Sequence, residues 1–112
     1  MKQGKESAME CVLVVAILRR TSLEAAEKRL QEVGVRDITV TKARGYGEHA
    51  DFLSSDHLVE QVKIEVFAPR DRARLIADTL VEARLGGAAE GEVVAILPVE
   101  AVIGGRGAPP VT

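Results

Sequence analysis

Apolar and polar positions along the chain fall into four strand-like stretches and two helix-like stretches. Residues 10–18 form a continuous run of apolar, largely β-branched side chains, which predicts a central strand. Residues 38–41 and 62–68 alternate with a period of two, and residues 93–97 form another short apolar run. The pattern therefore predicts four strands.

Two stretches carry apolar residues at helical spacing. The first has the stripe Leu23, Ala26, Leu30 and Val33, and the second has Ala73, Ile76, Ala77 and Leu80. Thr21 with Glu24 three positions on is the signature of a capping box, and Gly34 predicts the end of the first helix. Pro69 predicts entry into the second helix, which ends near Arg84. From Gly45 to about His57 little periodicity remains, so we expect a loop there.

The order of elements, β-α-β, loop, β-α-β, predicts an α+β fold of the ferredoxin-like type. That fold has one antiparallel four-stranded sheet with two helices on one face. The first strand is apolar on both faces, because Val12, Val14 and Ala16 alternate with Leu13, Val15 and Ile17. Two helices cover only one face, so we expect the other face to be buried against further copies of the chain.

Composition narrows the class of protein. The chain has 112 residues, 46% of them hydrophobic, a size and composition that predict one globular domain. The net charge of −2 offers no basic excess for nucleic acid or an anionic membrane. No apolar run has transmembrane length, so we expect a cytoplasmic protein without membrane insertion. The single cysteine, Cys11, lies in the first strand and is expected to be a buried, unreactive thiol.

Three glycines stand close together between the second helix and the last strand. They are Gly86, Gly87 and Gly91 in the stretch RLGGAAEGEVV, residues 84–94. Glycines suit a helix stop and turn, and they also let backbone N–H groups converge on an anion. The stretch by itself is compatible with both interpretations.

Three further stretches stand in a fixed order around it: TVTKARGYG (39–47), VKIEV (62–66) and PVEAVIGGRG (98–107). With RLGGAAEGEVV, their order and spacing resemble the PII signal-transduction proteins. The resemblance implies a homotrimer that binds adenine nucleotides in clefts between subunits and acts as a sensor, with no catalytic residues, metal site or resident cofactor. It also implies a mobile loop, here residues 45–61, that engages a target protein.

The resemblance assigns roles to individual residues. Thr39 and Phe67 match positions at the adenine pocket, and Gly45 and Gly47 match the glycines at the base of the mobile loop. Residues 84–92 match the phosphate loop, with contacts from Gly86, Gly87, Ala88, Ala89, Glu90 and Gly91. Arg106, in the tail of residues 104–112, matches an arginine that reaches the neighbouring subunit's site, and residues 1–9 are an extension.

The sequence departs from the family pattern at charged positions that would contact the phosphates or a second ligand. Glu92 stands nearest the usual lysine of the phosphate loop, and Gly104 replaces the first tail arginine. Glu48 and His49 replace an arginine and a glutamine, and the loop is short and lacks a tyrosine. These departures favour ADP, AMP or a cyclic nucleotide over Mg-ATP with 2-oxoglutarate. They resemble the carboxysome- and bicarbonate-associated branch, in which His49 or Lys63 would contact phosphate or bicarbonate.

Other interpretations remain open at this point. A trimeric metal-binding protein of the CutA type shares the fold. Separately, His49, Asp51, Asp56 and His57 are residue types that bind metal ions. A polar loop surface explains those four residues more simply. A small enzyme is disfavoured because Ser54, Ser55, Asp56 and His57 are adjacent on one loop, without the arrangement of a triad. Two arginine clusters, residues 19–20 and 70–74, are expected to be solvated.

Overall fold

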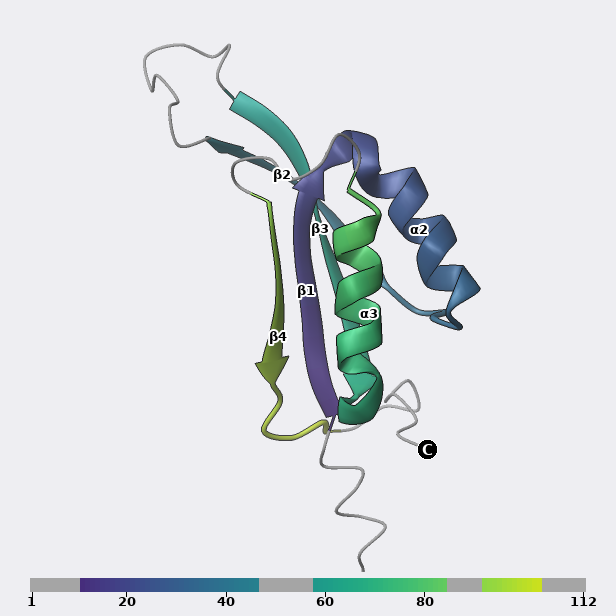
Figure 1. Cartoon of the computed structure of the whole chain (residues 1–112). Helices are drawn as coiled ribbons and strands as arrows, with labels where there is room; N and C mark the ends of the chain where they lie inside the picture. The colour runs from purple at the N-terminus through teal and green to yellow at the C-terminus, as the bar shows by residue number, and fades with distance from the viewer. Residues whose placement is uncertain (1–10, 47–57, 85–91, 104–112) are drawn as a thin grey trace, which may run out of the picture.

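The computed structural model describes residues 11–46, 58–84 and 92–103, with residues 45, 46, 58 and 59 described by their backbone alone. Its strands are β1 (Cys11–Arg19), β2 (Thr39–Tyr46), β3 (Leu58–Pro69) and β4 (Val93–Pro98). Its helices are α2 (Leu23–Glu32) and α3 (Arg70–Glu82), and a short 3-10 turn, η1 (Arg20–Ser22), precedes α2. Figure 1 shows the arrangement.

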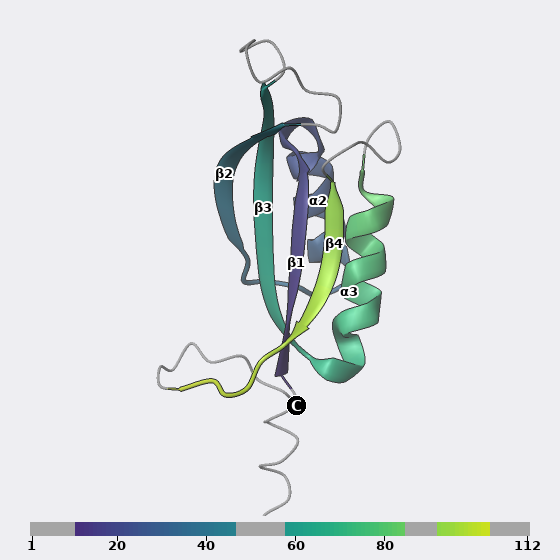
Figure 2. The ribbon, with the colours of Figure 1, turned by 90° about the vertical axis from the view of Figure 1, so that its left-hand side faces the viewer.

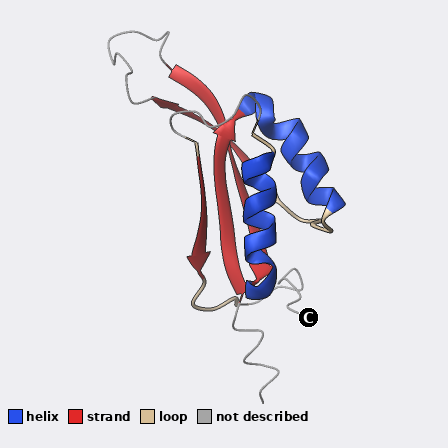
Figure 3. Ribbon diagram, in the orientation of Figure 1, coloured by secondary structure: helices blue, strands red, loops and turns tan. Residues whose placement is uncertain are grey.

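The four strands form one antiparallel sheet in the order β2-β3-β1-β4. Both helices lie on the same face of this sheet, as the blue helices against the red strands show (Figure 3). Figure 2 looks onto the sheet with the helices behind and beside it. The predicted ferredoxin-like α+β fold is confirmed. Neither described helix has the length and apolar character needed to cross a membrane.

The core lies between the sheet and the two helices. Alternate residues of β1 and β3 face the helices and are buried: Val12, Val14, Ala16, Leu18, Val62, Ile64, Val66 and Ala68. The helices contribute all four residues of the second predicted stripe, Ala73, Ile76, Ala77 and Leu80. Of the first stripe, Ala26 and Leu30 are in the core and Leu23 packs against it, whereas Val33 is outside it. The alternating residues of the strands and the apolar stripes of the helices therefore pack into one core, as the sequence predicts.

The ends of α2 confirm one sequence prediction and contradict another. Gly34 has a φ of +91°, and Val35 N–H donates a 2.9 Å hydrogen bond to Leu30 O, so the glycine ends the helix as predicted. The predicted capping box is wrong, because Thr21 lies within η1 and the residue before α2 is Ser22, whose side chain makes no cap hydrogen bond. The 3-10 turn takes the place of a side-chain cap.

The sheet extends further toward the predicted mobile loop than the pattern indicates. β2 continues to Tyr46, opposite Leu58 at the start of β3, and Gly45 lies opposite Val59. The expectation of a loop over residues 45–61 is therefore wrong at both ends, because antiparallel pairing carries the two strands past their periodic stretches. Residues 47–57 lie outside the described residues.

The face of the sheet away from the helices is apolar in its middle. Leu13, Val15 and Ile17 of β1 are half-buried there, as the two-sided pattern of that strand predicts. The rows across the sheet pair Leu13 with Phe67 and Leu97, and Ile17 with Lys63 and Val93. In the single chain Phe67 is 51% exposed, Val93 48% and Leu97 42%, so no described element covers this face.

Candidate functional site

A cavity of about 590 Å³ opens beside the last residues of β3. Its walls are the turn of residues 34–39, residues 65–69 of β3, and the side of α3 at Arg72 and Ile76. Two residues predicted to contact the nucleotide, Thr39 and Phe67, both line it. The structure therefore brings together the two positions that the resemblance places at the adenine pocket.

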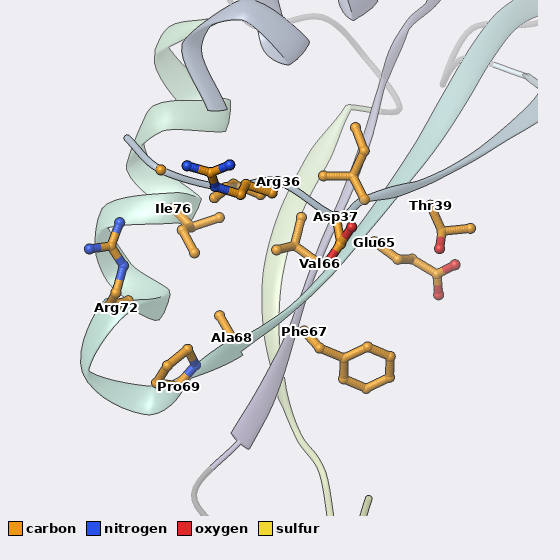
Figure 4. Close-up of a pocket in the computed structure, with 13 residues that line it drawn as sticks. Arg36, Asp37, Thr39, Glu65, Val66, Phe67, Ala68, Pro69, Arg72 and Ile76 are labelled. Carbon is orange, nitrogen blue, oxygen red and sulfur yellow. The ribbon is translucent and has the colours of Figure 1, made fainter. Parts of the chain in front are cut away.

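The cavity exists because β2 is shorter than its neighbour. β2 pairs with β3 only as far as Thr39 opposite Glu65, whereas β3 continues to Pro69 in its pairing with β1. Beyond Thr39 the chain leaves the sheet for the turn that joins it to α2, so none of the described strands pairs with that edge of β3 there. Figure 4 shows Thr39, Glu65 and Phe67 on one side of β3, with Arg72 and Ile76 on the helix side.

The cavity lining combines an aromatic ring, a hydroxyl group and charges of both signs. The half-exposed ring of Phe67 offers a face for stacking, and Thr39 offers a hydroxyl group that both donates and accepts hydrogen bonds. Arg36 and Arg72 supply positive charge, and Asp37 and Glu65 supply negative charge. A flat heterocycle with polar edges matches this combination of groups.

The turn that forms one wall is tied to α3. Arg72 Nη2 donates a hydrogen bond to Val33 O at the end of α2, just before Gly34. The guanidinium group therefore satisfies a carbonyl at the helix C-terminus, where a positive charge is also favourable. Arg72 is exposed, as expected, and also makes this contact, whereas the exposed Arg74 pairs with Asp78 at 3.0 Å along the same helix.

Gly45, another described residue assigned to the nucleotide, lies toward the opposite end of the sheet. Glu92, the residue after the glycine-rich stretch, accepts a 2.9 Å hydrogen bond from the backbone N–H of Arg19. Arg19 lies opposite Gln61, which in turn lies opposite Ala43, two residues before Gly45. The end of the glycine-rich stretch and the base of the predicted mobile loop therefore meet at one end of the sheet.

The distance between these two ends follows from the strand register. Six residues separate Thr39 from Gly45 along β2, and six separate Leu13, opposite Phe67, from Arg19 along β1. At about 3.3 Å per residue, each separation is about 20 Å. Within one chain, the candidate base pocket and the candidate phosphate-binding end are therefore far apart.

Several predicted site residues lie outside the described residues. These are Gly47, His49, Gly86, Gly87, Ala88, Ala89, Glu90, Gly91 and Arg106. Lys63 is described, and its Nζ lies 3.9 Å from Glu65 Oε2 on the helix-free face. Because Glu65 lines the cavity, this pair is at its border.

The described residues contain no cluster of three or more potential metal ligands. The four loop residues whose types bind metal ions lie outside the described part of the chain. Cys11 is 2% exposed, as predicted, and burial raises the pKa of its thiol, with a backbone hydrogen bond at Ala68 opposing the rise. A buried, protonated thiol is a poor nucleophile and a poor metal ligand.

Among the cavity residues that sequence reasoning missed are three charged ones, Arg36, Asp37 and Arg72. Arg36 and Asp37 follow the predicted helix stop in a turn without periodicity, so no pattern distinguishes them from solvent-facing charges. Arg72 belongs to a run of arginines on α3, where spacing alone does not reveal a hydrogen bond to a residue 39 positions away. The glycine at position 34 is a partial signal, since a tight helix end often receives a capping donor.

The sheet order and the single helical layer define a ferredoxin-like α+β domain. Within that class, residues 11–108 match the family described as Nitrogen regulatory protein P-II, and the chain belongs to this family. The P-II homolog of Arabidopsis thaliana is 30% identical over 99 residues, which are 80% of this chain and 50% of that protein. The chain thus spans about half the length of that plant relative.

Two further comparisons support the family and the fold. The Nitrogen regulatory protein P-II of Rhizobium meliloti (strain 1021) is 29% identical over 97 residues, covering 80% of this chain and 87% of that protein. The crystal structure of Arabidopsis thaliana PII bound to citrate superposes with a TM-score of 0.72 at 28% identity. That superposition covers 89% of this chain and 87% of the plant chain. These relatives are named as regulatory proteins, which agrees with the expectation of a non-enzymatic role.

Proposed function

We propose that the chain is a homotrimeric regulatory protein that binds an adenine nucleotide in clefts between subunits. The base would occupy the cavity at Thr39 and Phe67 of one copy. The phosphates would meet the glycine-rich stretch of a neighbouring copy, with Arg106 contributing from a C-terminal tail. Nucleotide binding would be signalled to a target protein through the loop that contains residues 47–57.

One observation carries this proposal, the separation between Phe67 and the sheet end that holds Glu92 and Gly45, which is about 20 Å to Arg19 at Glu92 and about 26 Å to Val59 opposite Gly45. That separation is longer than the reach from the base of a nucleoside diphosphate to its second phosphate group. Both halves can contact one nucleotide only if they come from different copies of the chain. A cleft between subunits satisfies this requirement, and a site within one chain does not.

The helix-free face supports assembly. Its apolar side chains, Leu13, Val15, Ile17, Phe67, Val93 and Leu97, are contributed by three adjacent strands. Monomeric proteins rarely leave a contiguous apolar surface of this kind in water, because its burial is favourable by about 25 cal/mol per Å². Copies packed face to face around a threefold axis would cover it and would bring the end of one sheet beside a neighbour's cavity.

The charges at the phosphate end favour a ligand with few negative charges. Glu92 places a carboxylate beside the glycine-rich stretch, where a lysine is usual in the family, and Gly104 removes an arginine from the tail. A carboxylate at this position opposes a triphosphate more strongly than a mono- or diphosphate. We therefore infer a preference for ADP or AMP over Mg-ATP with 2-oxoglutarate.

The short loop and its histidine, His49, resemble the bicarbonate-associated branch of the family and support bicarbonate as a second ligand. His49 and Lys63 are the candidates for a second ligand, bicarbonate, next to the nucleotide. The arrangement would let the protein report adenylate state, and bicarbonate with it, to a partner in bicarbonate metabolism. Ligand binding can change the loop only to the extent that the nucleotide binds its two states with different affinity.

Isothermal titration calorimetry with ADP, AMP, ATP and cyclic AMP, each with and without bicarbonate, tests the proposal. We expect saturable binding of one nucleotide per chain, with ADP or AMP tighter than Mg-ATP. Incubation with each nucleotide, followed by chromatography, should show no turnover. Failure of all four nucleotides to bind at millimolar concentration would refute the proposal.

A further inference from the structure

A second hollow, of about 490 Å³, lies where η1 meets the ends of β2 and β3. Its lining residues are Arg20, Lys42, Ala43, Arg44, Glu60 and Gln61. None of them is among the residues assigned above to nucleotide, second ligand or phosphate. We call it the basic hollow.

The register of the sheet places its charged groups together. Lys42 and Arg44 are two residues apart on β2, so their side chains share one face of the sheet, about 7 Å apart. Lys42 lies opposite Val62, which is part of the core under the helices, so this shared face is the helix side. Thr39 and Phe67, by contrast, belong to the helix-free face at the other end, which separates the basic hollow from the base pocket.

The hollow concentrates positive charge on an acidic chain. Arg20, Lys42 and Arg44 contribute three positive charges and Glu60 one negative charge, a net of +2, whereas the whole chain carries −2. Glu60 Oε1 is committed to Arg20 Nε at 2.9 Å. In the described part of the chain, Lys42 and Arg44 take part in no ion pair or side-chain hydrogen bond, whereas Arg29, Lys63 and Arg74 each have a carboxylate partner.

The basic hollow lies close to the ends of β2 and β3 that flank the loop of residues 47–57. Arg44 and Glu60 face each other in the pair of residues that precedes Gly45 and Val59. One further pair, Tyr46 with Leu58, completes the described ends of the two strands. A protein engaged through the loop between these strands would therefore pass close to Lys42 and Arg44.

We propose that the basic hollow binds an acidic segment of the target protein, with carboxylates of that segment pairing with Lys42 and Arg44. This rests on the proposed function for the existence of a target and for its engagement through the loop between β2 and β3. A peptide fits better than a small anion because both cations are exposed and each pair alone contributes little in water. A segment with several carboxylates adds these contributions, since the second pair forms at high effective concentration.

The test uses a fluorescein-labelled hexaglutamate peptide, with hexaglutamine as the neutral control, and fluorescence anisotropy at low ionic strength. We expect the full-length wild-type protein to bind hexaglutamate and not hexaglutamine. Lys42→Glu combined with Arg44→Glu should weaken binding by about tenfold or more, because two ion pairs become two repulsions. Glu60→Gln should strengthen it, because Arg20 is released and a repelling carboxylate is removed.

Lys28→Glu combined with Arg29→Glu is the matched control, since both residues are exposed on α2 and the change in net charge is the same. It should retain binding within about twofold if the site is local. Equal loss in both double variants, or no binding by the wild type, would overturn the proposal. Inorganic phosphate should displace the peptide no better than sodium chloride of equal ionic strength. Stronger displacement by phosphate would assign the hollow to a free phosphate ion instead.

Titration of the same variants with ADP separates this inference from the nucleotide proposal. Lys42→Glu with Arg44→Glu should retain saturable ADP binding, because these side chains face the helix side of the sheet and are not assigned to the nucleotide. Since Arg44 directly precedes Gly45 at the phosphate end, the affinity should fall by no more than about fivefold. Loss of peptide binding with intact ADP binding supports the basic hollow. Peptide binding without any nucleotide binding would refute the proposed sensor and leave the hollow in place.

Discussion

The backbone N–H of Arg19 donates a hydrogen bond of 2.9 Å to Glu92 Oε2, although the two residues are 73 positions apart. Arg19 is the last residue of β1, and Glu92 stands just before β4. The Glu92 side chain therefore adds one contact beyond the last backbone pair of these two strands. Because the bond fixes the carboxylate, it also holds the end of the glycine-rich stretch against the sheet and keeps a negative charge there.

Replacing Glu92 with glutamine should change nucleotide preference more than stability. Glutamine keeps an oxygen that accepts the Arg19 hydrogen bond, but it removes the charge that repels phosphate. We expect ATP affinity to rise several-fold and AMP affinity to rise less, because ATP carries more negative charge. Calorimetric titration of both ligands measures the ratio, with Glu32→Gln on α2 as the control. Equal gains for ATP and AMP would contradict the assignment of Glu92 to the phosphate end.

The hydrogen bond from Arg72 to Val33 O should contribute to stability. Arg72→Ala removes a charged donor from the end of α2, and we expect the free energy of unfolding to fall by about 1 kcal/mol, since water can replace part of the contact. Arg74→Ala removes only an exposed pair on the same helix and should cost less than about 0.5 kcal/mol. Urea denaturation compares the two variants. A larger loss for Arg74→Ala would show that the α2–α3 contact is unimportant.

The apolar helix-free face should hold the subunits together. Val15 lies in the middle of the helix-free face, opposite Glu65 and Ala95. Val15→Lys therefore places a charge in the interface that a trimer would bury. With a chain mass of 12.0 kDa, sedimentation should give about 36 kDa for the wild type and about 12 kDa for the variant. Leu75→Lys, on the exposed side of α3, is the matched control and should stay trimeric. A trimeric Val15→Lys protein would locate the interface elsewhere.

Cys11 gives stability a specific pH dependence. Burial raises the pKa of its thiol above the ordinary value of 9.0, so the unfolded chain releases this proton at lower pH than the folded one. The contribution to stability is fully present below pH 9 and is lost as pH rises through the folded-state pKa. The free energy of unfolding should therefore fall more steeply above pH 9 in the wild type than in Cys11→Ala. Parallel pH profiles would show that the thiol is not shielded.

The fold could be predicted because the sequence shows both the two-residue period of the strands and the 3.6-residue period of the helices. Val12, Val14 and Ala16 alternate with Leu13, Val15 and Ile17, and this strand sits in the middle of the sheet as its two apolar faces require. The ends of β2 and β3 could not be predicted, because pairing between the strands, rather than periodicity, extends them to Tyr46 and Leu58.

The candidate site could be predicted only in part, for a related reason. Thr39 begins one of the quoted motifs and Phe67 directly follows another, so both were identified, and the structure places both on one cavity. Arg36 and Arg72 were missed, because their roles depend on a turn and a helix end that approach each other in space. The separation between Phe67 and Gly45 also has no signature in the sequence, since it follows from the register of three strands.

If the proposed site is correct, one nucleotide takes its base contacts from one copy of the chain and its phosphate contacts from another. Phe67→Asp should destroy the base pocket, and Gly87→Asp should destroy the phosphate contacts. Neither variant alone should therefore bind ADP. Refolded together in equal amounts, the two should regain roughly a quarter of the wild-type sites, because half of the clefts have an intact Phe67 and half of those an intact glycine loop. Calorimetric stoichiometry near that fraction is the predicted result. Mixed trimers, verified by native mass spectrometry, that regain no site would place both halves in one chain and contradict the account.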